Sequence, residues 1–296
     1  MLLTSTEWDE VLHRTAFYAE NHAIKGALVL EALSADEAFA DMSWRGWLSC
    51  WQLLDSPRAV AMLSTDMQFD VSGFATPRLQ SIVRAGVFPL AYSAAVVWES
   101  RVGLRAMVQS ARSHVLEHVD ELGHSFTIWK SFADVAQREL TPEQRALAAE
   151  RFAEFLGAPS LRSEYQAPSA AEPLAPDAEL ASLVPRAARC MGFMGHTVIT
   201  LSAGLSAPLA LDEKRMLRDA LHNVLTRDEA VAARPEPSTG ALQDAMRVLL
   251  TEGPRDVHTL TFAHAAWSLR PWLTSDDEDA LSAALLVEAK RILRRG

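Results

Sequence analysis

The stretch that decides the fold is Cys190–Glu213, CMGFMGHTVITLSAGLSAPLALDE. It is a mostly apolar run that stays uncharged until the acidic pair Asp212–Glu213, with His196 near its front and Pro208 near its end. The uncharged part is long enough to raise a membrane span. However, one histidine, four Ser/Thr, three Gly and one Pro make it too polar for a span. We therefore expect a buried core helix here.

The same pattern returns elsewhere in the chain. HTVI (His196–Ile199) becomes HTLT (His258–Thr261), and each is followed by a proline and then by an acidic helix start. Two looser copies begin at His22, with HAIKGALVLEALSADE, and at His124, with HSFTIWKSF. Because these copies share apolar helical spacing after the histidine, they predict a series of helix–turn–helix units.

The fold class that follows is all-α: helix–turn–helix repeats packed into one helical domain that covers residues 1–296. Strand signals are almost absent, since there is no Asn-Gly hairpin and no sustained alternation of apolar and polar residues. A segment rich in Pro, Ala and Ser at about 157–177 reads as a linker or surface loop. Because both sides of it carry the repeat, we favour one domain.

Composition narrows the class of protein. The chain has 296 residues, 49% of them hydrophobic and 22% charged, which is typical of a soluble globular protein. A formal net charge of −10 argues against a nucleic-acid partner. The two cysteines form neither a disulfide framework nor a metal motif, and the first residues do not resemble a signal peptide. We expect a cytoplasmic protein without a membrane span.

Several helix boundaries can be predicted. Apolar spacing favours one helix over residues 7–33 and a long helix from Val102 to Glu121. Ser34-Ala-Asp-Glu has the pattern of a capping box, which would start a helix at Ser34. Thr141-Pro142-Glu143 is a second helix start, with proline at the first helical position.

His22, His124, His196 and His258 occupy equivalent places in the repeat. Taken singly, each is most simply an ordinary buried histidine bonded to a carbonyl. Taken together, they indicate one shared site, because repeat units stack equivalent positions on one side of the assembly. Four converging imidazoles would form a ligand set for iron, copper or zinc. The sequence leaves both interpretations open.

Other candidate residues are weaker. His114, Glu117 and His118 share one helix face and could hold a metal, although a solvated charged face explains them equally well. No G-x-S-x-G or H-E-x-x-H motif is present. Three tryptophans fall in or near the first helices of repeats, where they could either fill the core or wall a flat aromatic ligand: Trp98, Trp129 and Trp267.

Four short segments carry a resemblance to a known family: NHAIKGALVLEAL (Asn21–Leu33), PRLQSIVRAGVFPLAYSAAVV (Pro77–Val97), HTVITLSAGL (His196–Leu205) and DVHTLTFAHAAWSL (Asp256–Leu269). They are similar to successive motifs of the questin oxidase-like family. The resemblance implies an all-helical fold and oxygen-dependent chemistry on polycyclic aromatic polyketides. In at least one branch, it implies a non-haem iron held by four histidines and a carboxylated lysine.

This chain departs from the family pattern at two positions. Phe88 stands where the second family histidine is expected, and Thr261 stands where the lysine is expected. His22, His196 and His258 match histidines of the family pattern by position, and the internal repeat offers His124 as a replacement ligand. The possible lysine ligands are Lys25 and Lys130, and the expected substrate pocket comprises Phe88, Trp98, Trp129 and Trp267.

The leading hypothesis is a divergent member of this family: an iron-dependent oxygenase of a biosynthetic pathway. It would act with O₂ on a polycyclic aromatic, polyketide-like substrate, by Baeyer–Villiger chemistry or by ring-cleaving dioxygenation. The alternative is a helical-repeat binding or scaffold protein that has lost the catalytic site and binds no metal. A weaker third hypothesis is a di-metal enzyme of the haem-oxygenase-like type.

Overall fold

The predicted all-α class is confirmed. The computed structural model describes residues 3–15, 22–47, 68–119, 123–157, 174–175, 179–229, 241–252 and 257–293, and no strand occurs within these ranges. Most of the expected loop at 157–177 lies outside them, so only Gly157 and residues 174–175 of that segment are described.

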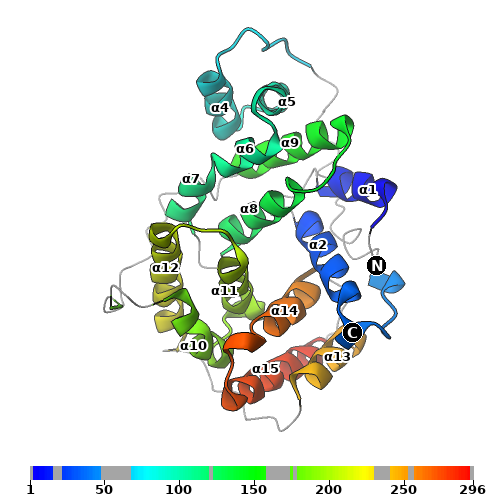
Figure 1. The fold of residues 1–296 in the computed structure, drawn as a ribbon, viewed down its shortest axis with the longest axis vertical. Coiled ribbons are helices and arrows are strands. Elements are labelled where there is room, and N and C mark those ends of the chain that lie inside the picture. Colours follow the sequence, from blue (N-terminus) through cyan, green and yellow to red (C-terminus); the bar gives the residue numbers. More distant parts are fainter. Residues whose placement is uncertain are drawn as a thin grey trace.

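Four helices form a ring at the centre of the molecule (Figure 1). They are α2 (His22–Ala35), α8 (His124–Val135), α11 (His196–Ser206) and α14 (Val257–Ser268). Each packs against the next in chain order, and α14 closes the ring by packing against α2. These are the four helices that the histidine repeat predicts.

The first residue of α8 and of α11 is fixed by a preceding glycine. Gly123 (φ 65°, ψ 17°) and Gly195 (φ 77°, ψ 13°) both have left-handed backbone, which glycine adopts without steric cost. At its other end, α11 stops at Ser206 because Ala207 is extended (φ −77°, ψ 141°), as expected for the residue before a proline.

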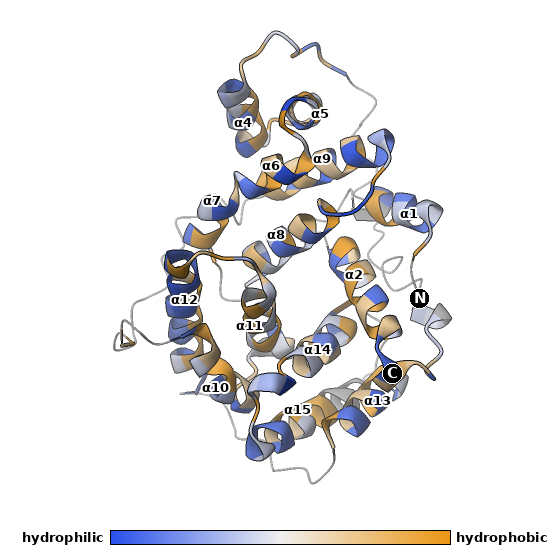
Figure 2. Ribbon diagram, viewed as in Figure 1, coloured by the Kyte–Doolittle hydropathy of each residue, from blue (hydrophilic) through white to orange (hydrophobic). Residues whose placement is uncertain are grey.

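The remaining helices surround this ring. They are α1 (Ser5–Thr15), α4 (Thr76–Ala85), α5 (Leu90–Val102), α6 (Leu104–Gln109), α7 (Arg112–Glu117), α9 (Pro142–Leu156), α10 (Val184–Arg189), α12 (Leu211–Glu229), α13 (Leu242–Glu252) and α15 (Ser275–Leu293). Helix α12 covers α11, and Figure 2 shows that α12 is much more hydrophilic than the helix it covers. Helices α5 and α9 pack together beyond α8, and α13 packs on α15 beside α14.

One hydrophobic cluster runs through the molecule, from Leu3 before α1 to Leu285 in α15. Its largest fully buried side chains include Trp47, Trp98 and Trp129. Among the described helices, none combines the length and the apolar character that crossing a bilayer requires.

Two predicted helix boundaries are wrong. Ser34 does not start a helix: it lies in the last turn of α2 and its hydroxyl donates to the Glu31 carbonyl, while Asp36 caps a short 3-10 turn instead. The long helix from Val102 to Glu121 is not continuous in the described residues: Val102 ends α5, Gly103 has a backbone (φ 80°, ψ 151°) that no helix accommodates, and Ser110 and Ala111 separate α6 from α7. For the predicted helix 7–33, the structure gives α1 and α2 as separate elements, and residues 16–21 between them lie outside the described ranges.

Candidate metal centre

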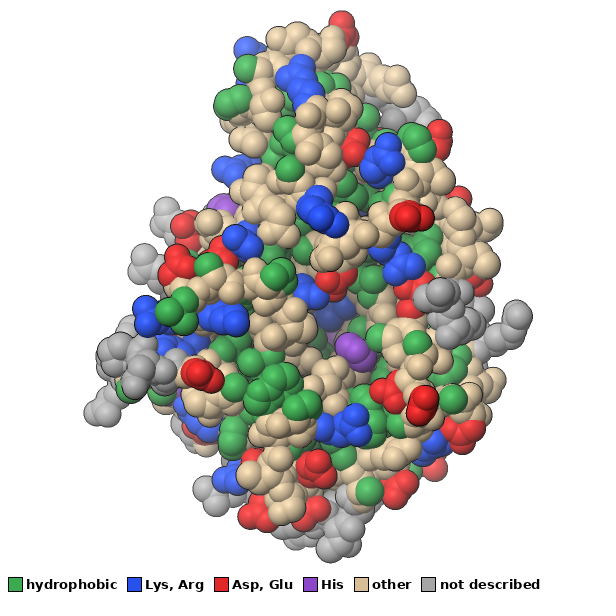
Figure 3. All heavy atoms as spheres, in the orientation of Figure 1, with side chains coloured by type: hydrophobic (Ala, Val, Ile, Leu, Met, Phe, Trp, Pro, Cys, Tyr) green, Lys and Arg blue, Asp and Glu red, His purple; other side chains and the backbone are tan. Residues whose placement is uncertain are grey.

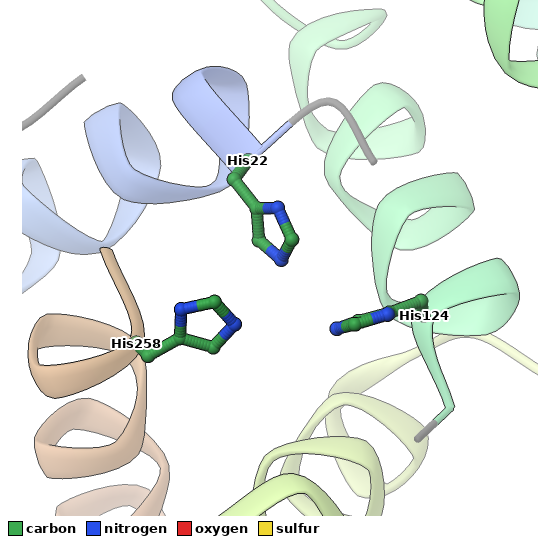
Figure 4. A group of neighbouring side chains, drawn as sticks. All are labelled: His22, His124 and His258. Atoms are coloured by element: carbon green, nitrogen blue, oxygen red, sulfur yellow. The ribbon is translucent and has the colours of Figure 1, made fainter. Parts of the chain in front are cut away.

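The four histidines of the repeat meet at the start of the four ring helices, and the predicted convergence is confirmed. His22, His124 and His196 are each the first residue of their helix, and His258 is the second residue of its own. Figure 4 shows three of the rings pointing toward one another from α2, α8 and α14. Ring centroids are 4.7 Å apart for His22–His258 and His124–His196, 5.0 Å for His22–His124, 5.3 Å for His196–His258 and 6.3 Å for His124–His258.

The closest contact joins two imidazole nitrogens. Nε2 of His196 lies 2.9 Å from Nε2 of His124, so one ring donates a hydrogen bond and the other accepts it. Ring nitrogens of His22, His124 and His258 all lie within 4.8 Å of one another. The cluster therefore presents several nitrogen lone pairs to one small volume.

Burial keeps the rings of His22 and His124 neutral. His22 and His196 are only 2% and 3% exposed. Burial, followed by the nearby Lys25 charge and the other imidazoles, holds the pKa of His22 well below 6.5. Burial and then His196 lower the pKa of His124 to about 3. At neutral pH both rings are unprotonated, which is the state in which imidazole binds a metal.

Lys25 lies one helical turn beyond His22 and is 6% exposed. Its ammonium donates to Oγ1 of Thr127 over 3.3 Å, and the Thr127 hydroxyl donates to the His124 carbonyl over 3.4 Å. Lys25 therefore bridges α2 and α8 close to the histidines. The second lysine candidate, Lys130, is placed differently, because its ammonium is bound to Asp134 at 2.6–2.7 Å.

A pocket of about 440 Å³ lies along the ring helices next to the histidine cluster, and none of the four histidines is part of its lining. The residue three places after each of the four histidines lines this pocket, and further lining residues come from the next two turns. Figure 3 shows the hollow at the centre of this face, with a histidine and Lys or Arg side chains inside it. The four residues at the third place, which form the end of the pocket beside the histidines, are Lys25, Thr127, Ile199 and Thr261.

His264 is a pocket residue that sequence reasoning did not assign to the site. It lines the pocket from α14, and burial, followed by the Lys130 charge, lowers its pKa to about 4. One signal could have found it: His264 follows His258 by six residues, as Lys130 follows His124 by six, and both side chains reach the same pocket.

None of the four residues expected to form an aromatic wall lines this pocket. Phe88 lies between α4 and α5 with its ring 4.8 Å from that of Tyr92. Trp98 is buried in α5, among the outer helices. The indole of Trp129 donates to the Val108 carbonyl on α6, and that of Trp267 donates to Asp36. The apolar part of the lining is aliphatic and includes Leu28, Val29 and Ile199, and the rest of the lining is polar or charged.

A second histidine group lies on α7. Ligand atoms of His114, Glu117 and His118 lie within 4.8 Å of one another, and the two imidazole centroids are 4.4 Å apart. Glu117 is exposed, and His118 Nδ1 is 2.7 Å from the His114 carbonyl. This group comes from a single helical turn at the surface, whereas the four-histidine centre is built from four helices.

Comparison with known proteins adds no relative. No family model matches the chain, and neither the curated proteins nor the solved structures give a significant match. The assignment of function therefore rests on the geometry of the four histidines and the pocket beside them.

Proposed function

We propose that this protein is a metal-dependent oxidoreductase in which His22, His124, His196 and His258 bind one transition-metal ion. The observation that carries the proposal is the meeting of four imidazoles from four helices beside a pocket of about 440 Å³. Ligand pockets of small-molecule enzymes commonly span about 300–1,000 Å³. A site of this kind suits one small organic substrate.

The nitrogen donors narrow the choice of metal. Imidazole nitrogens favour iron, copper, zinc or nickel over magnesium or calcium, which prefer oxygen ligands. We propose iron, with O₂ as co-substrate, in keeping with the resemblance to the questin oxidase-like family. A bound redox-active iron would supply the activation of O₂.

The ring positions fit such an ion. Two nitrogens that each lie about 2.1 Å from one metal at right angles are about 3.0 Å apart. The Nε2 atoms of His124 and His196 are 2.9 Å apart. The nitrogens of His22, His124 and His258 lie within 4.8 Å of one another, close enough for the three residues to hold one metal ion.

Residues of the pocket have separate roles in this proposal. The aliphatic side chains of Leu28, Val29 and Ile199 bind the apolar body of the substrate and exclude water from the reacting end. Thr127 holds the Lys25 ammonium beside the histidines. His264, neutral at pH 7, offers a hydrogen-bonding imidazole further along the pocket.

The alternative is a metal-free scaffold protein, and one observation favours it. The hydrogen bond between His124 and His196 shows that these imidazoles also satisfy each other without a metal. In that case, the cluster would be a buried polar network that fixes how four helices pack.

Metal content and stability of His196→Ala separate the two functions. We expect the untagged wild-type protein to hold about one metal per chain by mass spectrometry, and the variant to lose it while keeping its far-ultraviolet circular dichroism. A metal-free wild type would support the scaffold if His196→Ala were also destabilised by roughly 1–3 kcal/mol, the cost of a lost buried hydrogen bond. Oxygen consumption with candidate substrates then tests the oxygenase class.

A further inference from the structure

The histidine group on α7 has no part in the proposed function. His114, Glu117 and His118 follow one another at spacings of three and one, so that all three lie within one helical turn and on one face. One ligand atom from each lies within 4.8 Å of those of the other two, and the two imidazole centroids are 4.4 Å apart. The three side chains are therefore close enough to share one ion.

A hydrogen bond fixes the tautomer of His118. Its Nδ1 lies 2.7 Å from the His114 carbonyl, and because a carbonyl oxygen can only accept, Nδ1 carries the proton. In the neutral ring, Nε2 then keeps its lone pair. Histidines that bind metals commonly have this arrangement, in which the other ring nitrogen donates to a carbonyl and orients the ring. His118 is therefore oriented to bind an ion through Nε2.

The charges on this helix favour a cation. The side chain of Glu117 is exposed, and its carboxylate forms no ion pair within the part of the chain that the structure describes. Arg112, which is the one Arg or Lys of α7, is paired with Glu213 of α12 at 2.6 Å. An unneutralised carboxylate attracts a divalent ion, and the two imidazoles favour a transition metal, since magnesium and calcium prefer oxygen ligands.

Neighbouring helices hold this turn in place. Helix α7 packs against α8 and α12 at one side of the molecule (Figure 1). The hydroxyl of Ser125, the second residue of α8, donates to the His118 carbonyl over 2.9 Å, and the Arg112–Glu213 pair joins the first residue of α7 to α12. Because both ends of the helix are anchored, an ion would meet ligands that are already in position.

We propose that His114, Glu117 and His118 form a second metal site, which binds a divalent transition-metal ion such as Zn²⁺ at the surface of the protein. Water completes the coordination, because one helical turn supplies only three ligands. With fewer ligands and more exposure to solvent, this site binds its ion more weakly than the four-histidine centre would. The proposal goes beyond the proposed function and does not depend on it, so either can fail without the other.

NMR of the imidazole rings tests the site residue by residue. In long-range ¹H–¹⁵N spectra of chelator-treated protein, assigned with single His→Asn variants, we expect His118 to have its proton on Nδ1. Added Zn²⁺ should shift the ring signals of His114 and His118 together and leave those of His13, an exposed histidine on α1, unchanged. If the signals of His114 and His118 do not move in excess Zn²⁺, the proposal is wrong.

One substitution with a matched control tests the carboxylate ligand. Glu117→Gln keeps the size of an exposed side chain, and it should weaken the Zn²⁺ response of both histidines at least about 10-fold. Glu252→Gln removes an exposed carboxylate at the end of α13 and should leave the response unchanged. Equal responses in Glu117→Gln and the wild type would overturn the three-ligand site.

Discussion

Helices α8 and α9 follow one another in the chain but begin in opposite ways. At α9, the Thr141 hydroxyl accepts the Gln144 N–H, the Gln144 side chain accepts the Thr141 N–H, and Pro142 takes the first helical position. At α8, Gly123 occupies the cap position with left-handed backbone and gives no side-chain hydrogen bond, and His124 follows directly. Helix α11 repeats this second arrangement with Gly195 and His196.

The two kinds of helix start have different roles: the start of α9 stabilises its helix, whereas the starts of α8 and α11 place a histidine in the cluster. A threonine cap stabilises a helix by roughly a few tenths of a kcal/mol relative to a glycine cap, and α8 and α11 forgo this small contribution. Their glycines instead allow close approach of the backbone, since a Cβ on Gly123 would overlap Thr200 and one on Gly195 would overlap Phe262. The starts of α8 and α11 therefore allow close packing between neighbouring helices beside the histidines, whereas the start of α9 stabilises its own helix.

The largest expected effect comes from removing the histidine at the start of α8, compared with removing the threonine cap at the start of α9. His124→Ala should weaken binding of Fe²⁺ or Co²⁺ by at least about 100-fold, since loss of even an outer-shell partner costs about 10–100-fold. Thr141→Ala should leave the affinity unchanged. His118→Ala, on the exposed group of α7, should also retain the tight site. Titration with Co²⁺, followed by its visible absorption, measures all three. Tight binding in His124→Ala would remove that residue from the ligand set.

The second test adds one methyl group beside the site. Gly195→Ala should destabilise the fold by about 3 kcal/mol, because left-handed backbone costs a residue with a Cβ about 1–2 kcal/mol and overpacking adds about 1–3 kcal/mol. Gly73→Ala is the control: its Cβ meets nothing within 4 Å, so its free energy of unfolding should change by less than about 0.5 kcal/mol. Urea unfolding measures both, and equal stability would mean that close packing at Gly195 is unimportant.

A third test concerns pH. At pH 7, His264 is unprotonated in both the folded and the unfolded chain. Below about pH 6.5 the unfolded chain binds the proton, whereas the folded chain does not until about pH 4, so stability falls with pH in this window. His22 and His124, whose pKa values are also lowered, act in the same direction. Between pH 7 and pH 5, metal-free His264→Asn should lose about 2 kcal/mol less stability than the wild type. Parallel pH profiles would contradict the neutral state of His264.

The smallest expected effect is at the α9 start. Thr141→Ala removes the capping box and should lower the free energy of unfolding by about 1 kcal/mol. Thr141→Ser should keep most of the stability, because its hydroxyl can still accept the Gln144 N–H. Thermal unfolding at fixed pH measures both variants. If alanine were as stable as serine here, the contrast between the two kinds of helix start would lose its energetic basis.

Helix content and helix starts could be predicted because they depend on short-range patterns. Apolar spacing and the Thr141-Pro142-Glu143 pattern predict α9, and the repeat of histidines predicts where α8 and α11 begin. Ser34 was predicted wrongly because its hydroxyl can also bond to the carbonyl of a preceding turn, as it does with Glu31.

The site was predictable only in part. Equivalence within the repeat was enough to bring four histidines together, but not to decide which neighbouring side chains share their pocket. Spacing from the histidine does not settle this: Glu31 and Trp267 both follow their histidines by nine residues, but Glu31 lines the pocket whereas the indole of Trp267 donates to Asp36. Lys25, three residues after His22, lines the pocket. Which side chains share the pocket therefore depends on how each helix packs against its neighbours.

Closure of the ring by α14 against α2 has a consequence for the order of events in synthesis. His22 belongs to the first helices made, and His258 follows roughly 240 residues later, a delay of about 10–50 s at ordinary translation rates. Until then, α2, α8 and α11 are present without α14, and the faces of α2 and α11 that α14 later covers are exposed to water. Any molecule that needs contact with all four helices can enter only a finished chain.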